Sequence, residues 1–394
     1  MGTGLLYTRY SARARSLLAP ALRRTPGVKR ALLKAAEVVD GGKHLLGVAA
    51  PTIIRPRTRH LSVAVTAACN LSCAGCRYGR EFMKGERLTT EDLVRIVDAA
   101  SAMGIWDIRL YGGEPLLHGG LQRVVRQAIQ RGLNPWLNTN GRLLDSRFDD
   151  LFDAGLRTVS IGLYGTGDEY DRYVGRTGAF EQLERSLSIL RSRHGSGVDV
   201  SLNYLLTRLS CTEEAVDRAY HFAGRFGAHL RFDLVHDSLP YFTEGPNRIL
   251  RFRDEDRSAL NAVVDRLLDI RREAPEIYAE SPRSIRSIPD WIFGDARRSL
   301  PCDRYDDIWI AADGSVQLCY AAFPLGNVRE RPLQDILYTA VHRQAARDAF
   351  ALRCPTCYCE RESRVNKWLI RRWPRNGQKS VRNDDYDVAA HLLR

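Results

Sequence analysis

The sequence lacks long apolar runs of the kind that cross a membrane or direct secretion. The apolar stretch at residues 45–54 ends after ten residues, whereas a membrane-spanning helix needs about 20. Arg9, Arg13 and Arg15 interrupt any early apolar run, so we expect no signal peptide and a cytoplasmic location. With 44% hydrophobic and 27% charged residues, the composition suits a soluble globular protein and argues against disorder.

Basic charge is concentrated at the start of the sequence. Most of the formal net charge of +12 comes from residues 1–59, where 12 Lys and Arg stand against two acidic residues. Leucines recur among these basic residues at helical spacing, which predicts a basic amphipathic helical leader. We interpret its charged face as solvated, and the alternative is a peripheral contact of residues 1–40 with an anionic membrane surface.

From His60 onward, strand-like and helix-like segments alternate. The strand-like runs cover residues 61–66, 106–111, 135–138, 158–163, 198–206 and 229–235, and the helical patterns lie near residues 91–103, 121–131, 147–154, 180–193 and 213–226. Thr90 is a suitable cap for the first of these helices. Six strands alternating with five helices predict an α/β fold of parallel βαβ units, as a barrel or an open sheet. Catalytic groups are then expected on loops after the carboxyl ends of the strands.

Beyond residue 235 the alternation ends, and the sequence divides into shorter parts. A charged helix is expected around residues 254–272, and cysteine spacing predicts a small separate module near residues 302–359. The predicted domains are a leader (1–59), an α/β core (60–235), a linker with a helix (236–300), a Cys-rich module (301–360) and a C-terminal tail on the surface (361–394).

Nine cysteines in a chain without a predicted secretory signal point to metal binding or redox chemistry more than to disulfides. Cys69, Cys73 and Cys76 follow the first predicted strand, with gaps of three and two residues. Structural zinc takes four protein ligands, whereas three cysteines on a [4Fe–4S] cluster leave one iron free for a further ligand. The spacing therefore predicts an inorganic centre with one open position, such as a [4Fe–4S] cluster, and a zinc or purely structural site is the alternative.

This loop resembles the cluster-binding loop of radical S-adenosylmethionine (SAM) enzymes. One βα unit later, Gly112, Gly113 and Glu114 resemble the family motif that binds the methionyl amino group of SAM, since glycines permit a close backbone approach and a carboxylate pairs with an ammonium. Asn140 and Ser160, at the ends of the third and fourth strands, match further family positions for SAM, although Asn140 could also be a simple turn residue. The resemblance implies a partial (β/α)6 TIM-like barrel.

Two glycines depart from the pattern of the family. Gly75 stands where many relatives have an aromatic residue beside the adenine of SAM, and Gly162 stands where the family usually has serine. These departures concern the local contacts with SAM and leave the expectation of a cluster unchanged.

The later cysteines resemble the twitch/SPASM auxiliary module that follows radical SAM barrels. Residues 309–316 have the pattern of strand, Asp-Gly turn and strand, which predicts a β-hairpin inside a small hairpin/helix module. The resemblance implies a second, auxiliary [4Fe–4S] cluster, and a structural zinc ribbon is the alternative. The expected ligands are Cys302, Cys319, Cys354 and Cys357, with Cys359 as a spare or alternative ligand.

Cys211 lies on the loop after the fifth predicted strand, on the face where a substrate is expected. Its thiol is a candidate catalytic group that donates a hydrogen atom to a substrate radical, as in radical epimerases. A lone cysteine is more often a small buried hydrophobic residue, and this is the alternative.

The resemblance implies reductive cleavage of SAM to a 5′-deoxyadenosyl radical, which abstracts hydrogen from a substrate. It also implies an electron donor of the flavodoxin or ferredoxin type, and electron transfer as the role of the auxiliary cluster. Residues 1–59 show no strand-rich pattern of a peptide-recognition domain. We therefore expect a small-molecule or glycosyl substrate that is oxidised, rearranged or epimerised in a biosynthetic pathway, with a peptide or a lipid-linked substrate as alternatives.

A protein of a different class, a zinc-containing nucleic-acid binder, is the non-enzyme alternative. The basic leader supports it, because phosphate binding depends on clustered Lys and Arg. The three-cysteine site with an open position and the lack of interleaved aromatic and basic residues argue against it. We therefore expect no nucleic-acid partner.

Overall fold

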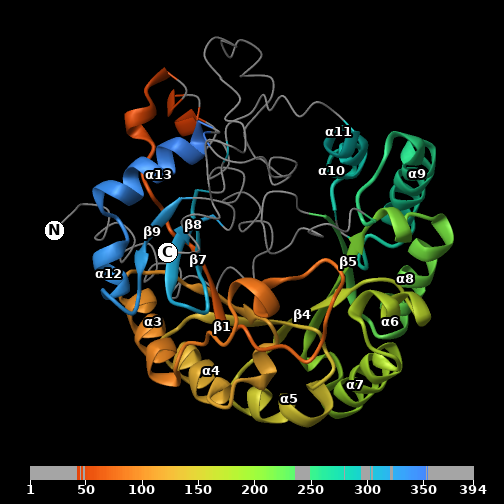
Figure 1. The fold of residues 1–394 in the computed structure, drawn as a ribbon, viewed down its shortest axis with the longest axis horizontal. Helices are drawn as coiled ribbons and strands as arrows, with labels where there is room; N and C mark the ends of the chain where they lie inside the picture. Colours follow the sequence, from red (N-terminus) through yellow and green to blue (C-terminus); the bar gives the residue numbers. More distant parts are fainter. Residues whose placement is uncertain are drawn as a thin grey trace, which may run out of the picture.

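The computed structural model describes residues 42–353, apart from residues 45, 48, 236–248, 279, 294–301, 303–304, 320–322 and 352. Its strands form one nine-stranded sheet in the order β6-β5-β4-β3-β2-β1-β7-β8-β9. The sheet curves into an arch with helices along its outer side (Figure 1). Among the described strands β6 and β9 end the order without pairing to each other, so the barrel is partial and open.

The core of the sheet consists of six parallel strands whose carboxyl ends lie at one edge. They are β1 (His60–Thr66), β2 (Asp107–Gly112), β3 (Asn134–Thr139), β4 (Thr158–Leu163), β5 (Asp199–Leu206) and β6 (His229–Leu234). All six lie within one or two residues of the predicted runs. The predicted α/β fold with a partial six-stranded barrel is confirmed.

Helices cover the outer side of the sheet and follow the strands along the chain (Figure 1). They are α3 (Thr90–Ala102), α4 (Leu121–Gln130), α5 (Leu144–Asp153), α6 (Asp168–Val174), α7 (Ala179–His194), α8 (Glu213–Arg225), α9 (Arg257–Glu273), α10 (Pro282–Arg286), α11 (Ile288–Phe293), α12 (Leu333–Ile336) and α13 (Ala340–Phe350). The sequence did not predict α6, because it has only seven residues and is mostly polar. Within the described part of the chain, no helix has the length and apolar character needed to cross a membrane.

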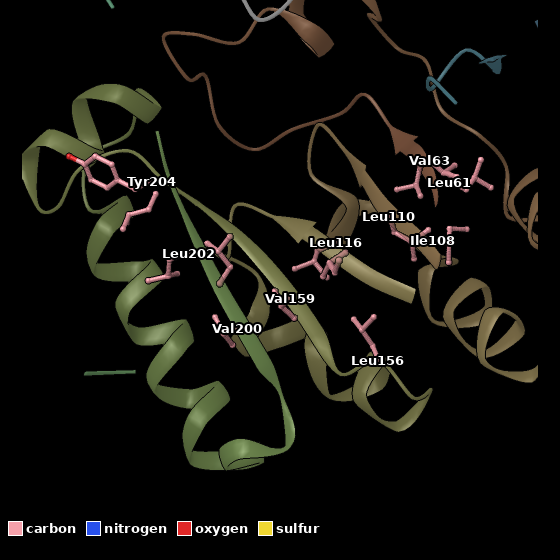
Figure 2. Packing of buried hydrophobic residues seen from close by; sticks show 14 of the residues in the cluster. Leu61, Val63, Ile108, Leu110, Leu116, Leu156, Val159, Val200, Leu202 and Tyr204 are labelled. Carbon is pink, nitrogen blue, oxygen red and sulfur yellow. The ribbon is translucent and has the colours of Figure 1, made fainter. Parts of the chain in front are cut away.

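The main hydrophobic core lies between the sheet and the helices. Successive side chains of a strand point to opposite faces, and Leu61 and Val63 of β1 are fully buried on the helix side together with Ile108 and Leu110 of β2. Figure 2 shows these four side chains side by side. The alternate positions of the same strands face the interior of the arch and include polar residues such as Arg109. The sheet therefore has an apolar outer face and a more polar inner face.

The predicted hairpin is present, and it extends the barrel sheet. Its strands and the next one are β7 (Asp307–Ile310), β8 (Ser315–Leu318) and β9 (Pro324–Asn327). β7 and β8 are antiparallel, with Ile310 opposite Val316, and β7 also pairs in parallel with β1. The sequence did not predict the pairing of β7 with β1, because the paired residues lie almost 250 positions apart, a distance at which local patterns give no signal.

Several predicted segments lie outside the described residues. These are most of the leader (1–59), the tail (361–394), the first part of the linker (236–248), and Cys354, Cys357 and Cys359. The predicted helix at residues 254–272 corresponds to a short turn of helix at Asp254–Asp256 followed by α9. The domain boundaries stay predictions.

The cap of α3 differs from the predicted one by one residue. Thr89, and not Thr90, is the N-cap: its hydroxyl accepts a hydrogen bond from the Asp92 amide (3.1 Å), and the Asp92 carboxylate accepts one from the Thr89 amide (3.0 Å). The reciprocal pair requires a carboxylate three residues after the threonine. Leu93, which follows Thr90 at that spacing, cannot supply it.

We predict that Thr89→Ala lowers the free energy of unfolding by about 1 kcal/mol, because it leaves the first amides of α3 without a side-chain acceptor. Thr90→Ala should change it by less than about 0.5 kcal/mol. The urea midpoint and the hydrogen-exchange rate of the Asp92 amide measure the difference. Equal destabilisation by the two substitutions would contradict the observed cap.

Candidate functional site

The loop after the carboxyl end of β1 carries the first three cysteines. Cys69 is exposed, and Cys73 and Cys76 are half-buried. The amide of Cys76 donates to the carbonyl of Cys73 (3.1 Å), and the guanidinium of Arg80 donates to the carbonyls of both residues, at 2.9 Å for Cys73. These bonds fold the loop back on itself, so the three predicted ligands lie in one place. Arg80 was not identified from the sequence, where it is one arginine among many.

The three thiols sit where burial disfavours thiolates. Burial raises the pKa of Cys69 to about 11 and also raises the pKa of Cys73 and Cys76. For Cys73 the two neighbouring thiols add to this effect. Thiolates at this site therefore need a cationic partner. Among the described His, Cys, Asp and Glu residues, no group of three is arranged to hold a single metal ion.

The glycine pair at the end of β2 lies directly beneath the cysteine loop. The amide of Gly113 donates to the Thr66 carbonyl (2.8 Å), and the amide of Glu114 donates to the Ala68 carbonyl (2.8 Å). A Cβ at Gly112 would collide with the Thr66 carbonyl, and a Cβ at Gly113 with those of Ala67 and Ala68. From the sequence, these glycines were expected to permit the close approach of a ligand. In the structure, their immediate role is to let the cysteine loop pack against β2.

Glu114 is completely buried between the ends of β2 and β3. Its carboxylate accepts hydrogen bonds from the Thr139 hydroxyl (2.7 Å), the Asn140 amide (2.8 Å) and the Leu116 amide (3.0 Å). Burial raises the pKa of Glu114, and these three donors act in the opposite direction. A carboxylate offers about four acceptor positions, so the Oε2 atom, which accepts only from Asn140 among these bonds, has capacity for one further donor.

Asn140 connects this buried carboxylate to the cysteine loop. Its side-chain Nδ2 donates to Oδ1 of Asn70 (2.7 Å) and lies 4.0 Å from the sulfur of Cys69. The structure therefore brings Asn140, Glu114 and the first cysteine together, as the sequence predicted. It adds Asn70, which lies between two cysteines and gave no separate signal in the sequence.

Ser160 lies in the middle of β4, on its inner face. It is 5% exposed, and its hydroxyl accepts a hydrogen bond from Nδ2 of Asn203 on β5 (2.8 Å). Oδ1 of Asn203 is buried and has no hydrogen-bond partner among the described residues. A polar pair with one unused acceptor thus faces the interior of the arch.

Two cysteines of the predicted auxiliary set can be placed. The Cys302 amide donates to the Phe350 carbonyl at the end of α13 (3.3 Å), and the Cys319 amide donates to the Asp307 carbonyl (2.8 Å). Cys319 and Cys76 both pack against one small apolar cluster, which includes Tyr78. The last residues of the hairpin and the cysteine loop of β1 therefore border the same patch of core. The four-cysteine ligand set stays a prediction.

Cys211 follows β5 as predicted, but its surroundings favour the structural alternative. The side chain is 4% exposed and belongs to the main core between the sheet and the helices. Burial raises the pKa of its thiol to about 12. A hydrogen donor to a substrate has to reach the inner face of the sheet, and Cys211 packs on the outer side.

An arginine that the sequence analysis did not single out lies inside the arch. Arg109 of β2 projects between aromatic rings, 4.2 Å from the ring centroid of Trp309, 5.1 Å from Tyr111 and 5.3 Å from Trp136. Its Nε atom is buried without a hydrogen-bond partner among the described residues, and burial lowers its pKa. The signal was available in the sequence, because Ile108 and Leu110 face outward and so place Arg109 on the inner face.

Two family models match the chain. The radical SAM superfamily matches residues 63–214, and the SPASM iron–sulfur cluster-binding domain matches residues 302–359. The first range begins in β1 and ends after β5, and the second covers all five cysteines of the predicted auxiliary set. Both matches argue against a zinc-containing nucleic-acid binder.

The curated relatives include proteins named GTP 3′,8-cyclase. The chain is 30% identical over 176 residues to a probable GTP 3′,8-cyclase of Pyrobaculum aerophilum, with 44% of this chain and 56% of that protein covered. It is 26% identical over 237 residues to a GTP 3′,8-cyclase of Staphylococcus saprophyticus, with 56% and 66% covered. The chain spans about half the length of the first curated relatives.

Solved structures with the same fold include proteins with bound SAM. SuiB of Streptococcus suis, bound to SAM, has a TM-score of 0.58 and 15% identity, with 85% of this chain and 79% of that chain covered. The protein anSMEcpe, with bound SAM and a peptide, has a TM-score of 0.56 and 18% identity, with 74% and 84% covered. The chain carries a radical SAM domain, which binds a [4Fe–4S] cluster and SAM, and a SPASM iron–sulfur cluster-binding domain.

Proposed function

We propose that Cys69, Cys73 and Cys76 hold a [4Fe–4S] cluster whose open iron binds SAM. The observation that carries this proposal is the folded loop at the carboxyl end of β1, where the thiols of Cys69, Cys73 and Cys76 are close enough to influence one another. When bound, this cofactor pair supplies a one-electron cleavage of SAM to a 5′-deoxyadenosyl radical that removes hydrogen from an unactivated carbon. The protein contributes binding, orientation and the exclusion of competing reactions.

The chain's own residues orient SAM around this loop. Gly112 and Gly113 keep β2 close beneath the cysteines, and the remaining acceptor position of Glu114 suits the ammonium group of SAM. Asn140 and Ser160 offer polar groups from the next two strands. A site composed of groups from four neighbouring strands and the loops that follow them fixes a ligand more rigidly than a single mobile loop does.

Residues 301–360 are proposed to hold an auxiliary [4Fe–4S] cluster on Cys302, Cys319, Cys354 and Cys357, with Cys359 as a spare or alternative ligand. The match to an iron–sulfur family over residues 302–359 supports this assignment. The apolar cluster shared by Cys76 and Cys319 supports electron transfer as its role, since one cysteine of each group packs against it. An electron donor of the flavodoxin or ferredoxin type is the proposed partner.

A small polar molecule, such as a nucleotide or a glycosyl compound, is the proposed substrate. Arg109 supports this choice, because a buried guanidinium among three aromatic rings can bind an anionic group while the rings pack against a sugar or a base. The curated relatives are named as acting on GTP, which has both features. Oxidation, rearrangement and epimerisation all remain compatible with this site.

A peptide is the second candidate substrate. It is favoured by the similarity in fold to SuiB bound to its precursor peptide SuiA and to anSMEcpe bound to a peptide. Among the described strands, β6 and β9 do not pair with each other, so the described sheet does not close around a ligand. The lipid-linked alternative depended on residues 1–40, which lie outside the described residues.

We predict that anaerobically reconstituted protein holds about eight irons per chain, four in each cluster. Cys76→Ala should hold about four and should lose SAM cleavage, because one iron of the first cluster loses its thiolate. Cys319→Ala should also hold about four irons but should retain some cleavage of SAM without forming product. Iron analysis and quantification of 5′-deoxyadenosine measure these outcomes.

The matched control is Cys211→Ala, which removes a thiol that packs in the main core. It should keep both clusters and SAM cleavage. Iron loss equal to that of Cys76→Ala would contradict the assignment of the loop. Unchanged iron in Cys319→Ala would contradict the auxiliary ligand set.

We predict that Arg109→Gln weakens the binding of an anionic substrate at least tenfold, because a hydrogen bond to a charged group is worth about 1.5–3 kcal/mol. The measurement is equilibrium binding of GTP, and of guanosine as the uncharged probe, to the reconstituted protein. GTP binding should fall, and guanosine binding should change little.

Arg123→Gln is the control, since Arg123 is an exposed arginine on the outer helix α4 and forms an ion pair with Glu91 (2.8 Å). It should leave GTP binding unchanged. If the wild-type protein binds neither GTP nor guanosine but binds a peptide, the result favours a peptide substrate over a small polar molecule. Equal effects of Arg109→Gln and Arg123→Gln on GTP would refute a specific role of Arg109.

A further inference from the structure

Two tyrosines lie face to face beside the cysteine loop. The rings of Tyr164, just after β4, and Tyr173, in α6, are stacked with their centroids 4.3 Å apart and their planes at 13°. Both side chains are partly exposed. The tyrosine pair is therefore not completely covered by the described residues.

The tyrosine pair belongs to the far end of the cysteine loop. The Ala74 amide donates to the Tyr173 carbonyl (2.8 Å), and the Ser72 amide donates to the Val174 carbonyl (3.1 Å). Figure 1 shows the loop after β1 reaching across the arch toward the α6 side. One end of the loop thus packs against Gly113 and Glu114, and the other end packs against the helix that carries Tyr173.

Each tyrosine occupies space that a glycine leaves free. A Cβ at Gly75 would lie 2.6 Å from the Tyr173 hydroxyl, and a Cβ at Gly162 would collide with the Tyr164 hydroxyl. Neither glycine has a positive φ, so backbone conformation does not require glycine at these positions. The structure shows instead that a side chain at Gly75 or Gly162 would take space used by one of the two tyrosines. The two positions at which the sequence departs from the family pattern are thus both explained by the tyrosine pair.

We propose that the tyrosine pair of Tyr164 and Tyr173 is the stacking surface for the adenine of SAM. The inference rests on the proposed function, since it requires SAM to bind at the cysteine loop. Adenine is the flat aromatic part of SAM, and nucleobases stack on aromatic side chains. With the amino-acid end of SAM near Glu114, the adenine extends toward the opposite end of the loop, where the tyrosine pair lies. The two tyrosines are positioning residues for the cofactor.

The test measures binding and does not depend on turnover. The dissociation constants of SAM and of methionine are measured by equilibrium dialysis on anaerobically reconstituted protein. Methionine has the amino and carboxylate groups of SAM but lacks the adenine. Tyr173→Leu and Tyr164→Leu should each weaken SAM binding about tenfold and leave methionine binding within about twofold. Tyr173→Phe and Tyr164→Phe, which keep the ring, should bind SAM within about twofold of the wild type.

Two controls separate the possible outcomes. Tyr220→Leu changes a half-buried tyrosine on α8 and should leave SAM binding unchanged. If the leucine variants weaken SAM and methionine equally, or lose iron, the pair only supports the loop and the inference is overturned. It is also overturned if they bind SAM like the wild type.

Failure of the proposed function gives a different result. If Cys76→Ala binds SAM as tightly as the wild type, SAM does not bind at this loop, and the proposed function fails together with the inference. If Cys76→Ala loses SAM binding while both leucine variants retain it, only the role of the tyrosine pair is refuted.

A double variant that moves the aromatic ring from position 173 to position 75 provides an independent test. Gly75→Phe alone should weaken SAM binding, because the new side chain collides with Tyr173. Combining it with Tyr173→Ala should restore affinity at least fivefold relative to Gly75→Phe, since a ring again lies beside the loop. Additive losses in the double variant would contradict stacking at this position.

Discussion

The close approach of two backbones places the cysteine loop, and the rest of the site depends on it. The end of β1 lies so near Gly112 and Gly113 that a Cβ at either position would collide with a carbonyl. The two hydrogen bonds of 2.8 Å that result join the loop to the end of β2 before any cysteine is reached. Any larger residue in this pair would push the loop away from the strand, so the three thiols owe their position to glycines that carry no chemistry of their own.

The buried carboxylate of Glu114 extends this constraint to the third strand. An unpaired buried carboxylate is costly, and three donors from the ends of β2 and β3 satisfy it. Asn140 continues the network to Asn70 and to the neighbourhood of Cys69. Networks of this kind are rigid because moving one member leaves another unsatisfied. The site is therefore preorganised by contacts between loops that are distant in the sequence.

Local patterns predicted the parts of the fold that local physics determines. Apolar runs located β1 to β6, and the cysteine spacing and Gly112-Gly113-Glu114 indicated residues that the structure places next to one another. The pairing of β7 with β1 joins residues almost 250 positions apart, and no local pattern contains it. The α6 helix was missed because its stability depends on packing: Tyr170 and Val174 are fully buried and Tyr173 is partly buried, while its other four residues are charged. Thr89 could have been chosen over Thr90, since only Thr89 has an acid three residues later.

The tyrosines beside the loop show why a motif read position by position gives an incomplete account of a site. Position 75 is a glycine, and the space beside it contains a ring contributed by α6. Only Ala74 and Gly75 lie between Cys73 and Cys76, and neither has a large side chain. Contacts with α6 and Arg80 therefore determine the shape of the loop. A closely packed site needs its volume filled, and the side chain that fills it can come from any segment that reaches the site. The missed helix and the unexpected glycines are therefore two aspects of one arrangement, which becomes visible only when the distances between segments are known.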